Sequence, residues 1–333
     1  MIEDKDPKGR SERAGATSSR GPKHDRGRSV ASAVVAEDPL RRGPPEFAAN
    51  VQVTNTEREW IREYLGKFYK DELILDVVRR VKAGKEATVY ACTGHPSTGR
   101  EIIAAKLYRE RSLRSTKNTG QYHQGRALLD GEGKAAKQRS GRPERAVTQS
   151  TKRGKAATQT SWIMHEFTLL QSMHAQGGDV PEAIGHADQA LLMEFFGEGL
   201  DAAPTLNDVE LESTAEAKQL FERVLFNIDL LLGLGWVHGD LSAYNILYHR
   251  GRIVLIDFPQ VADCQNNPRA RSIFDRDVER VTQYFGRFGC DTDHRKLAQQ
   301  LWSKHVAAPT PEDMRPEDLE WEDPARQDPE PEE

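Results

Sequence analysis

The sequence predicts an α+β fold of two lobes, with a strand-rich N-terminal lobe and a helical C-terminal lobe. Before residue 110 the apolar residues form mainly short β-prone runs, whereas after residue 160 they recur largely at helical spacings. Strands that come first in the chain, followed by long helices, are typical of an α+β architecture. The 333 residues are enough for one two-lobed unit with flexible ends.

The N-terminal lobe is predicted to open with a helix and continue with strands. Over 57–68 five large apolar residues recur at spacings of three and four, which predicts an amphipathic helix. A first strand is expected over 73–81. The β-prone runs 88–92 and 102–108 flank a turn region around Gly94, which predicts a hairpin.

Longer helices are expected in the second half of the chain. Over 161–173 the apolar residues suit a helix, and over 215–234 they recur on one face of a helix that ends at two glycines. Strand-like apolar runs occupy 190–195 and 253–256.

Three zones differ in composition from the rest of the chain. Residues 1–48 are rich in Gly, Ser, Pro, Arg and Lys, so they are predicted to form a disordered basic and polar arm. Residues 306–333 are Pro-rich and predicted to form a disordered acidic tail. Residues 109–155 carry 13 Lys or Arg against 4 Asp or Glu, which predicts a flexible basic insert extending to residue 158. The folded domain is expected over 55–305, with an N-lobe at about 55–193 and a C-lobe at about 197–305.

Cysteine use and hydropathy favour an intracellular protein. Cys92, Cys264 and Cys290 are widely spaced and odd in number, which suggests neither a disulfide framework nor a zinc site. The first residues are charged, and no apolar run approaches the length of a signal peptide or a membrane span. A cytoplasmic location without a membrane partner is therefore expected.

The most informative motif is His-Gly-Asp-Leu-Ser-Ala-Tyr-Asn over 238–245, followed by a strand-like run that ends at Asp257. Phosphoryl transfer needs little covalent chemistry from the protein, so catalysis rests on positioning and charge neutralisation. Asp240 is expected to accept or orient the proton of an attacking hydroxyl, while Asn245 and Asp257 offer hard oxygen ligands to magnesium. His238 is expected to buttress the loop. Either fragment alone would be a turn or a solvated strand end, but together they predict a kinase-type ATP enzyme.

A second element of chemistry lies at the turn after the first predicted strand. One glycine and small residues there would let backbone N–H groups approach phosphate oxygens. The segment lacks the full Gly-x-Gly-x-x-Gly pattern, so an ordinary hairpin turn is the alternative. The residues expected to contact the nucleotide are Lys82, Ala83, Gly84, Lys85, Glu86 and Val89.

Lys106 and Glu166 are expected to form an ion pair beside the phosphates. Lys106 lies on the next predicted strand, where a kinase keeps the lysine that contacts the α- and β-phosphates. Glu166 lies on the helix after the basic insert and is its natural partner. An exposed strand lysine and a solvated helix glutamate are the alternatives.

Three segments together resemble the RIO family of atypical serine protein kinases and ATPases. They are Gly-Lys-Glu-Ala-x-Val-Tyr at 84–90, the motif at 238–245, and Ile-Asp-Phe-Pro-Gln at 256–260. Phe-Asp-Arg-Asp-Val at 274–278 is also similar to that family, and the resemblance spans about residues 55–300. It implies a reduced protein-kinase-like fold, ATP with Mg²⁺, and transfer to a serine of a protein or of the enzyme itself.

The resemblance also implies roles for individual residues. The metal-binding Asp257 is implicated as a transient phosphoryl acceptor, so both Asp240 and Asp257 are predicted to be catalytic. Glu194 with Phe196 resembles the hinge that meets adenine through backbone groups. The remaining implied roles are a catalytic base (Asp240), metal ligands (Asn245 and Asp257), a phosphate-binding lysine (Lys106) and its ion-pair partner (Glu166).

Departures from ordinary protein kinases bear on the expected reaction. Gly239 stands where those enzymes have Arg, and no Ala-Pro-Glu element follows Asp257. Control by activation-loop phosphorylation and an extended peptide platform are therefore not expected, which favours autophosphorylation or ATP hydrolysis.

The lineage signals are mixed. Too few ordered residues precede Leu73 for the N-terminal winged helix of one RIO branch, which favours the branch without it. Asp-Phe-Pro-Gln at 257–260 is more like the branch that has it. This mixture predicts a separate, bacterial lineage.

The basic insert and the reaction class each leave alternatives open. Archaeal and eukaryotic RIO proteins act in small-subunit maturation, so 109–155 is either a solvated loop or a cationic arm for RNA or a ribosomal particle. Tyr122 is its one aromatic residue, so stacking on bases is not expected. The alternative functions are a small-molecule phosphotransferase of the aminoglycoside-kinase type and an ATP-gated, non-catalytic assembly scaffold.

Overall fold

The structure is a computed structural model that describes residues 47–109, 122, 124, 129 and 152–306. These residues belong to one compact unit. The predicted arm up to residue 46, most of the predicted insert and the tail from residue 307 onward lie outside the described residues.

Two predicted boundaries are corrected by the structure. Phe47 is buried and stacks on Tyr69 with ring centroids 5.1 Å apart, so the arm does not extend to residue 48. Helix α4 (Lys152–Ala175) includes the last part of the predicted insert. Its apolar pattern begins only at Trp162, which is why the sequence placed the helix start too late.

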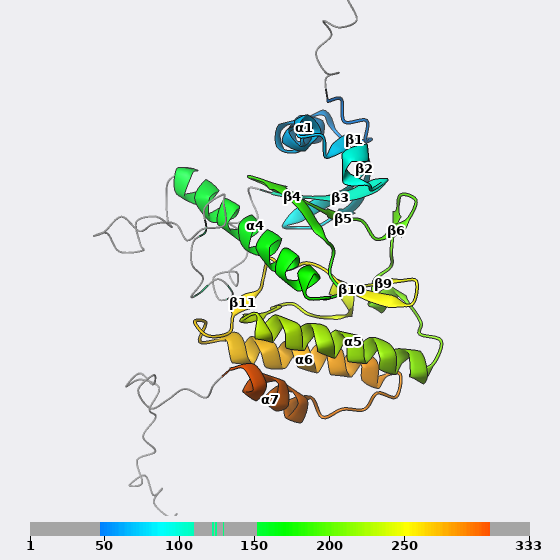
Figure 1. The fold of residues 1–333 in the computed structure, drawn as a ribbon, viewed down its shortest axis with the longest axis vertical. Coiled ribbons are helices and arrows are strands. Elements are labelled where there is room, and N and C mark those ends of the chain that lie inside the picture. The colour runs from blue at the N-terminus through cyan, green and yellow to red at the C-terminus, as the bar shows by residue number, and fades with distance from the viewer. Residues whose placement is uncertain (1–46, 110–121, 123, 125–128, 130–151, 307–333) are drawn as a thin grey trace, which may run out of the picture. The chain divides into compact units, whose positions relative to one another are not determined.

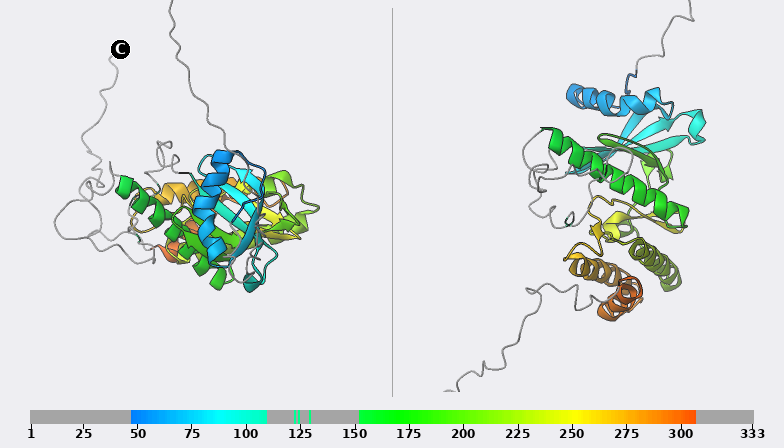
Figure 2. Two further views of the ribbon diagram at one scale, coloured as in Figure 1. Left: turned by 90° about the horizontal axis from the view of Figure 1, so that it is seen from above. Right: turned by 60° about the vertical axis from the view of Figure 1, so that its left-hand side comes forward.

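The N-lobe is built on a five-stranded antiparallel sheet with strand order β1-β2-β3-β5-β4. Figure 1 shows this sheet between helix α1 and helix α4, and the second view of Figure 2 agrees. The strands are β1 (Ile74–Ala83), β2 (Ala87–Gly94), β3 (Ile102–Tyr108), β4 (Ala183–Ala187) and β5 (Ala190–Glu194).

Side-chain alternation gives the sheet two different faces. On one face Tyr90, Ala105 and Leu192 join a core cluster with α1 (Asn55–Lys70), whose Leu65 is fully buried. The opposite face carries Lys106, so this lysine points away from the α1 core. Register supports this, because Val89, Lys106 and Leu191 are successive partners across β2, β3 and β5.

The C-lobe is mainly helical, with α5 and α6 packed together and α7 against them (Figure 1). Its helices are α5 (Thr214–Gly233), α6 (Ala270–Gly286) and α7 (His294–His305). Its short strands pair as β6 (Gly197–Glu198) with β7 (Asp201–Ala202), β8 (Trp236–Val237) with β11 (Ala262–Asp263), and β9 (Ile246–His249) with β10 (Arg252–Leu255). Single 3₁₀ turns occur at Pro96–Thr98, Leu206–Asp208 and Ala243–Asn245.

The described architecture confirms the predicted α+β, two-lobed fold. Every predicted helix and strand is present, with ends shifted by a few residues and an earlier start for α4. The sequence interpretation did not include β4, α6 or α7. Among the described residues, no helix combines the length and apolar character that membrane crossing requires.

Candidate active site

A β-hairpin brings the two predicted metal ligands together. Leu255 of β10 pairs with Ile246 of β9, and the Ile256 N–H donates to the Asn245 carbonyl over 3.0 Å. Asn245 immediately precedes β9, and Asp257 follows this extra ladder bond by one residue. The antiparallel pairing therefore sets both side chains at the same end of the hairpin.

Asp257 adopts a backbone conformation that is uncommon for a residue with a side chain. Its φ angle is 71°, in the left-handed region, and such strain is concentrated at functional positions. Its carboxylate lies 2.7 Å from the Lys106 ammonium and its side chain is 46% exposed. Burial of the group opposes ionisation, but Lys106 outweighs it and holds the pKa of Asp257 below its usual range.

Lys106 joins the N-lobe helix to the C-lobe site. Its Nζ atom lies 2.8 Å from Glu166 Oε1 on α4 as well as 2.7 Å from Asp257 Oδ1. Burial disfavours the charged amine, yet the carboxylates of Asp257 and Glu166 raise the pKa of Lys106 well above its ordinary value. The Tyr108 hydroxyl donates to the other Glu166 oxygen, which holds the glutamate in place. The predicted ion pair is therefore present in the structure.

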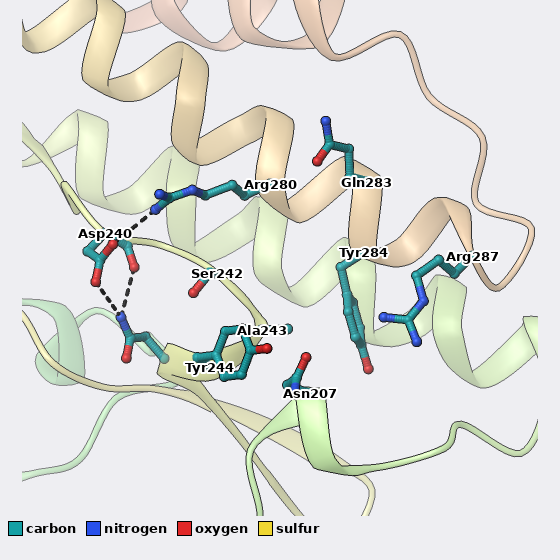
Figure 3. Close-up of a pocket in the computed structure, with 10 residues that line it drawn as sticks. Asn207, Asp240, Ser242, Ala243, Tyr244, Arg280, Gln283, Tyr284 and Arg287 are labelled. Carbon is teal, nitrogen blue, oxygen red and sulfur yellow. Dashed lines mark hydrogen bonds and ion pairs between the residues drawn. The ribbon is translucent and has the colours of Figure 1, made fainter.

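Asp240 lies within a set of hydrogen bonds on the loop after β8. The Asn245 amide nitrogen donates to its carbonyl over 2.8 Å and to its Oδ2 over 3.1 Å. Arg280 Nη1 on α6 donates to its other carboxylate oxygen over 2.9 Å. Figure 3 shows Arg280 extended toward Asp240 at one end of a pocket. These bonds orient Asp240 while leaving its side chain 41% exposed.

The loop that carries Asp240 is fixed by a buried carboxylate of α6. Gly239 has a φ of 87°, and a side chain there would clash with the Gln260 carbonyl. Its N–H donates to the Asp277 carboxylate over 2.7 Å, and the Leu241 N–H bonds to the same carboxylate. Burial raises the pKa of Asp277 to about 7, although Arg276 and these N–H groups oppose the shift.

His238 serves as a support rather than a proton carrier, as expected. Its Nε2 donates to the Ile256 carbonyl over 3.2 Å, and its Nδ1 accepts from the Asp240 N–H over 3.3 Å. Burial lowers the pKa of His238 to about 4. The neutral imidazole thus ties the 238–245 loop to the end of β10.

The predicted phosphate loop is a tight turn between β1 and β2. Lys82, Ala83, Gly84 and Lys85 are exposed, and the Gly84 N–H donates to the Ala87 carbonyl over 2.9 Å. Glu86 is the loop residue whose pKa is affected by the other carboxylates of the site. Burial, together with the charges of Asp257 and Asp240, raises the pKa of Glu86 despite the lowering effect of Lys106. Val89 lies beside Lys106 in the register of the sheet.

The two predicted hinge residues lie at the end of β5 and just after it. The Glu194 N–H donates to the Glu182 carbonyl, and the Phe196 carbonyl accepts from the Ala203 N–H, each over 2.9 Å. The Glu194 carbonyl and the Phe196 N–H are the backbone groups of these residues that take no part in these two bonds.

Several contributing residues were not identified from the sequence. Tyr108 follows Lys106 by two positions, so strand alternation could have placed it on the same face. Asp277 stood within a recognised motif but had no assigned role. Arg280 had no local signal, because its contact with Asp240 spans 40 residues of sequence. Tyr122 is buried against Gly239 and accepts from Arg276.

Asn245 and Asp257 offer oxygen donors of the kind that magnesium accepts. Asn245 uses its amide nitrogen for both bonds to Asp240, which leaves the amide oxygen for a cation. Lys106 contacts Asp257 Oδ1 at 2.7 Å, so Asp257 offers its second carboxylate oxygen to a cation. In the described ranges no cluster of three or more His, Cys, Asp or Glu forms a metal site. Mg²⁺ is commonly held by few protein ligands together with phosphates and water.

This geometry defines a kinase-like phosphotransferase, and comparison with known proteins identifies its family. The RIO domain family matches residues 88–297, so the chain belongs to this family. The RIO-type serine/threonine-protein kinase Rio1 of Thermoplasma acidophilum is 29% identical over 143 residues, which cover 43% of this chain and 73% of that protein. Rio1 of Haloferax volcanii is 29% identical over 217 residues, covering 65% of this chain and 66% of that protein.

Other relatives are matched over a smaller share of their length. The serine/threonine-protein kinase rio1 of Schizosaccharomyces pombe is 28% identical, over 69% of this chain and 42% of that protein. Among solved structures, the Rio2 kinase of Chaetomium thermophilum is similar with a TM-score of 0.49 and 18% identity, covering 74% of this chain and 69% of that one. The predicted RIO family and its enzyme class, serine/threonine-protein kinase, are confirmed at the level of the family. The bacterial lineage stays a prediction.

Proposed function

We propose that this protein transfers the γ-phosphoryl group of ATP, with magnesium, to a serine hydroxyl of a protein or of itself, or to water. The observation that carries the proposal is the position of Lys106, which contacts Glu166 and Asp257 at once. The Lys106 ammonium thus pairs with the buried Glu166 and with Asp257, the residue expected to bind the metal. The loop that carries Asp240 lies beside the same hairpin.

The chemistry of the proposal follows from the roles of these groups. The serine oxygen forms a bond to the γ-phosphorus, the bond from that phosphorus to the β–γ bridging oxygen breaks, and ADP leaves with the electron pair. Asp240 accepts the hydroxyl proton, and Arg280 holds its carboxylate in position. Magnesium held by Asn245 and Asp257 would neutralise phosphate charge. Lys106 would contact the α- and β-phosphates.

Asp257 has a second proposed role. Its carboxylate oxygen would attack the γ-phosphorus and displace ADP, giving an aspartyl phosphate. A water that gives a proton to Asp240 would then attack this phosphorus and break its bond to Asp257, which releases inorganic phosphate. The strained φ of 71° and the lowered pKa, which keeps the carboxylate ionised, support this role. The same two-step route accounts for ATP hydrolysis without a protein acceptor.

The nucleotide contacts are proposed from the remaining site residues. The backbone from Lys82 to Glu86, with Val89 beside it, would lie over the phosphates and the base. The Glu194 carbonyl and the Phe196 N–H would meet adenine.

Labelled ATP tests the proposal directly. Purified protein is incubated with γ-labelled ATP and magnesium, and both released phosphate and label on protein are followed beside Asp240→Ala. We expect one or both signals in the wild type, and in the variant neither released phosphate nor label on serine, because both need Asp240 as the proton acceptor. ATP binding without either signal would favour the alternative scaffold, and label transferred only to small hydroxylated compounds would favour the alternative phosphotransferase.

We also propose, from sequence and family context, a cytoplasmic role in ribosome-related assembly with RNA contacts through 109–155. The 13 basic against 4 acidic residues of this segment support it. RNA binding that weakens steeply with salt, and more weakly after charge removal in this segment, is the expected result.

A further inference from the structure

A polar pocket of about 550 Å³ opens beside Asp240, outside the predicted contacts to the nucleotide. It lies between the 238–245 loop, the turn at Asn207 and one face of α6 (Figure 3). Its volume is in the range of sites that hold ligands or short peptide segments. Because Asp240 is at its edge, whatever fills this pocket lies next to the proposed proton acceptor.

The α6 face gives the pocket its charge. Arg280, Gln283, Tyr284 and Arg287 all line the pocket, at spacings of three and four residues, so they share one helical face. Arg280 is engaged with Asp240 at 2.9 Å. Arg287 is exposed at the other end of the pocket, with Tyr284 between the two (Figure 3).

Arg287 is held in place without an acidic partner among the described residues. Its guanidinium lies over the rings of Tyr284 and Phe288, 5.4 and 5.7 Å from their centroids. Tyr284 is in turn fixed by its hydroxyl, which donates to the Leu206 carbonyl over 2.6 Å. An exposed guanidinium supported in this way is prepared to bind an anion.

The helix sets the distance between the two ends of the pocket. Seven positions at about 1.5 Å rise place Arg287, the C-cap residue of α6, about 10.5 Å along the axis from Arg280, and the Arg280 side chain extends further toward Asp240 (Figure 3), so the two ends of the pocket are about 10 Å or more apart. An extended peptide rises by about 3.3 Å per residue, so three or more residues are needed to cover this distance. We propose that the acceptor is a protein segment whose serine is at Asp240 and whose acidic side chain, three or more residues away, pairs with Arg287.

The inference rests on the proposed kinase activity and narrows its substrate. It differs from the sequence expectation that no peptide platform exists, because α6 supplies a surface that needs no activation loop. The pocket contains two guanidinium groups and the Asp240 carboxylate, which does not favour a polycationic aminoglycoside. RNA could also meet two arginines, but Asp240 at the pocket edge repels a phosphate backbone there.

A peptide scan tests the proposal. Short serine peptides carry a single Glu that is moved stepwise away from the serine in each direction, with Gln or Lys in its place as controls. Transfer from γ-labelled ATP is measured as kcat/KM. We expect a maximum at a separation of three or more residues, with Glu favoured over Gln by up to about fivefold, the effect of one exposed ion pair.

Variants then connect the preference to Arg287. The Glu-to-Gln ratio should fall to about one in Arg287→Ala, and Lys should be favoured in Arg287→Glu. Arg295→Ala, which removes an exposed arginine of α7 outside the pocket, should keep the wild-type ratio. Comparing two peptides on each variant makes the result independent of the amount of active protein.

The outcomes separate the inference from the proposed function. Four outcomes would overturn the inference and leave the kinase/ATPase proposal standing. They are a flat scan, a maximum at a separation of one or two residues, a Glu-to-Gln ratio retained in Arg287→Ala, and no labelled peptide despite Asp240-dependent ATP turnover. RNA binding lost in Arg287→Ala together with a flat scan would overturn it in favour of a nucleic-acid site. Absence of all Asp240-dependent turnover would refute the proposed function itself.

Discussion

Glu166 and Asp257 contact the same ammonium at nearly the same distance, yet their replacement by amides should have different consequences. Lys106 Nζ lies 2.8 Å from Glu166 and 2.7 Å from Asp257. The Glu166 side chain is 2% exposed, whereas that of Asp257 is 46% exposed. We expect Glu166→Gln to destabilise the fold, and Asp257→Asn to abolish magnesium-dependent turnover while leaving the fold intact.

Burial determines the size of each effect. Removing one charge of a buried pair costs about 3–5 kcal/mol, because the remaining charge loses its partner in a poorly solvated setting. In Glu166→Gln the ammonium keeps Asp257 and the new amide oxygen can still accept, so about 2–3 kcal/mol is expected. The Lys106–Asp257 pair is exposed on the Asp257 side only, and in Asp257→Asn the ammonium keeps Glu166, so a loss of about 1 kcal/mol, close to that of an exposed pair, is expected. Asp257 also raises the pKa of Glu86, so its neutralisation relieves a repulsion that offsets part of this loss.

Urea unfolding followed by tryptophan fluorescence, beside labelled-ATP turnover, measures both effects. The exposed Asp201, which pairs with Arg79 at 2.7 Å, provides the control Asp201→Asn, expected to change neither quantity appreciably. A loss of about 2 kcal/mol or more in Asp257→Asn would refute the reasoning from burial. Wild-type turnover in that variant would remove Asp257 from the site, and wild-type stability in Glu166→Gln would show that the buried pair is not anchored as described.

Three further predictions concern the loop around Asp240. Burial raises the pKa of Asp277 to about 7, so activity should rise between about pH 6 and 8 as the carboxylate forms and accepts from both N–H groups. The free energy of unfolding should fall from about pH 4 to 7, because the folded pKa exceeds the ordinary one. Asp277→Asn should remove both trends, and a rise in activity that persists in this variant would exclude Asp277 as its source. Because burial lowers the pKa of His238 to about 4, its imidazole signals in nitrogen NMR should stay those of a neutral ring from pH 8 to 5.5, and a midpoint near 6.5 would contradict the burial. Gly239→Ala should cost more stability than Gly199→Ala in thermal unfolding, since both have positive φ but only Gly239 would clash with the Gln260 carbonyl; equal costs would mean that the loop moves freely.

Local patterns were sufficient for the elements whose residues contact mainly their neighbours in sequence. The β2–β3 hairpin follows from two β-prone runs around one turn, and α5 from an apolar face that ends at glycines. By contrast, α7 has a thin apolar stripe at Leu297, Leu301 and Trp302, which is a weak signal by itself. This helix is stabilised by packing on α6, as the contact of Trp302 with Phe274 illustrates.

The site shows the same division between local and tertiary information. Asp240, Asn245 and Asp257 were recognisable because phosphoryl transfer requires these groups within one loop and one hairpin, and the hairpin register then brings them together. Arg280 and Asp277 contact the same loop from α6, three residues apart. Asp277 stood in a recognised motif that gave it no role, and nothing in the local sequence distinguishes Arg280 from an exposed arginine. Helical periodicity predicts only that Arg280 and Asp277 lie near each other on α6. The catalytic residues of the 238–245 loop could therefore be predicted from the sequence. The groups that orient this loop, and the pocket beside it, depend on where α6 packs.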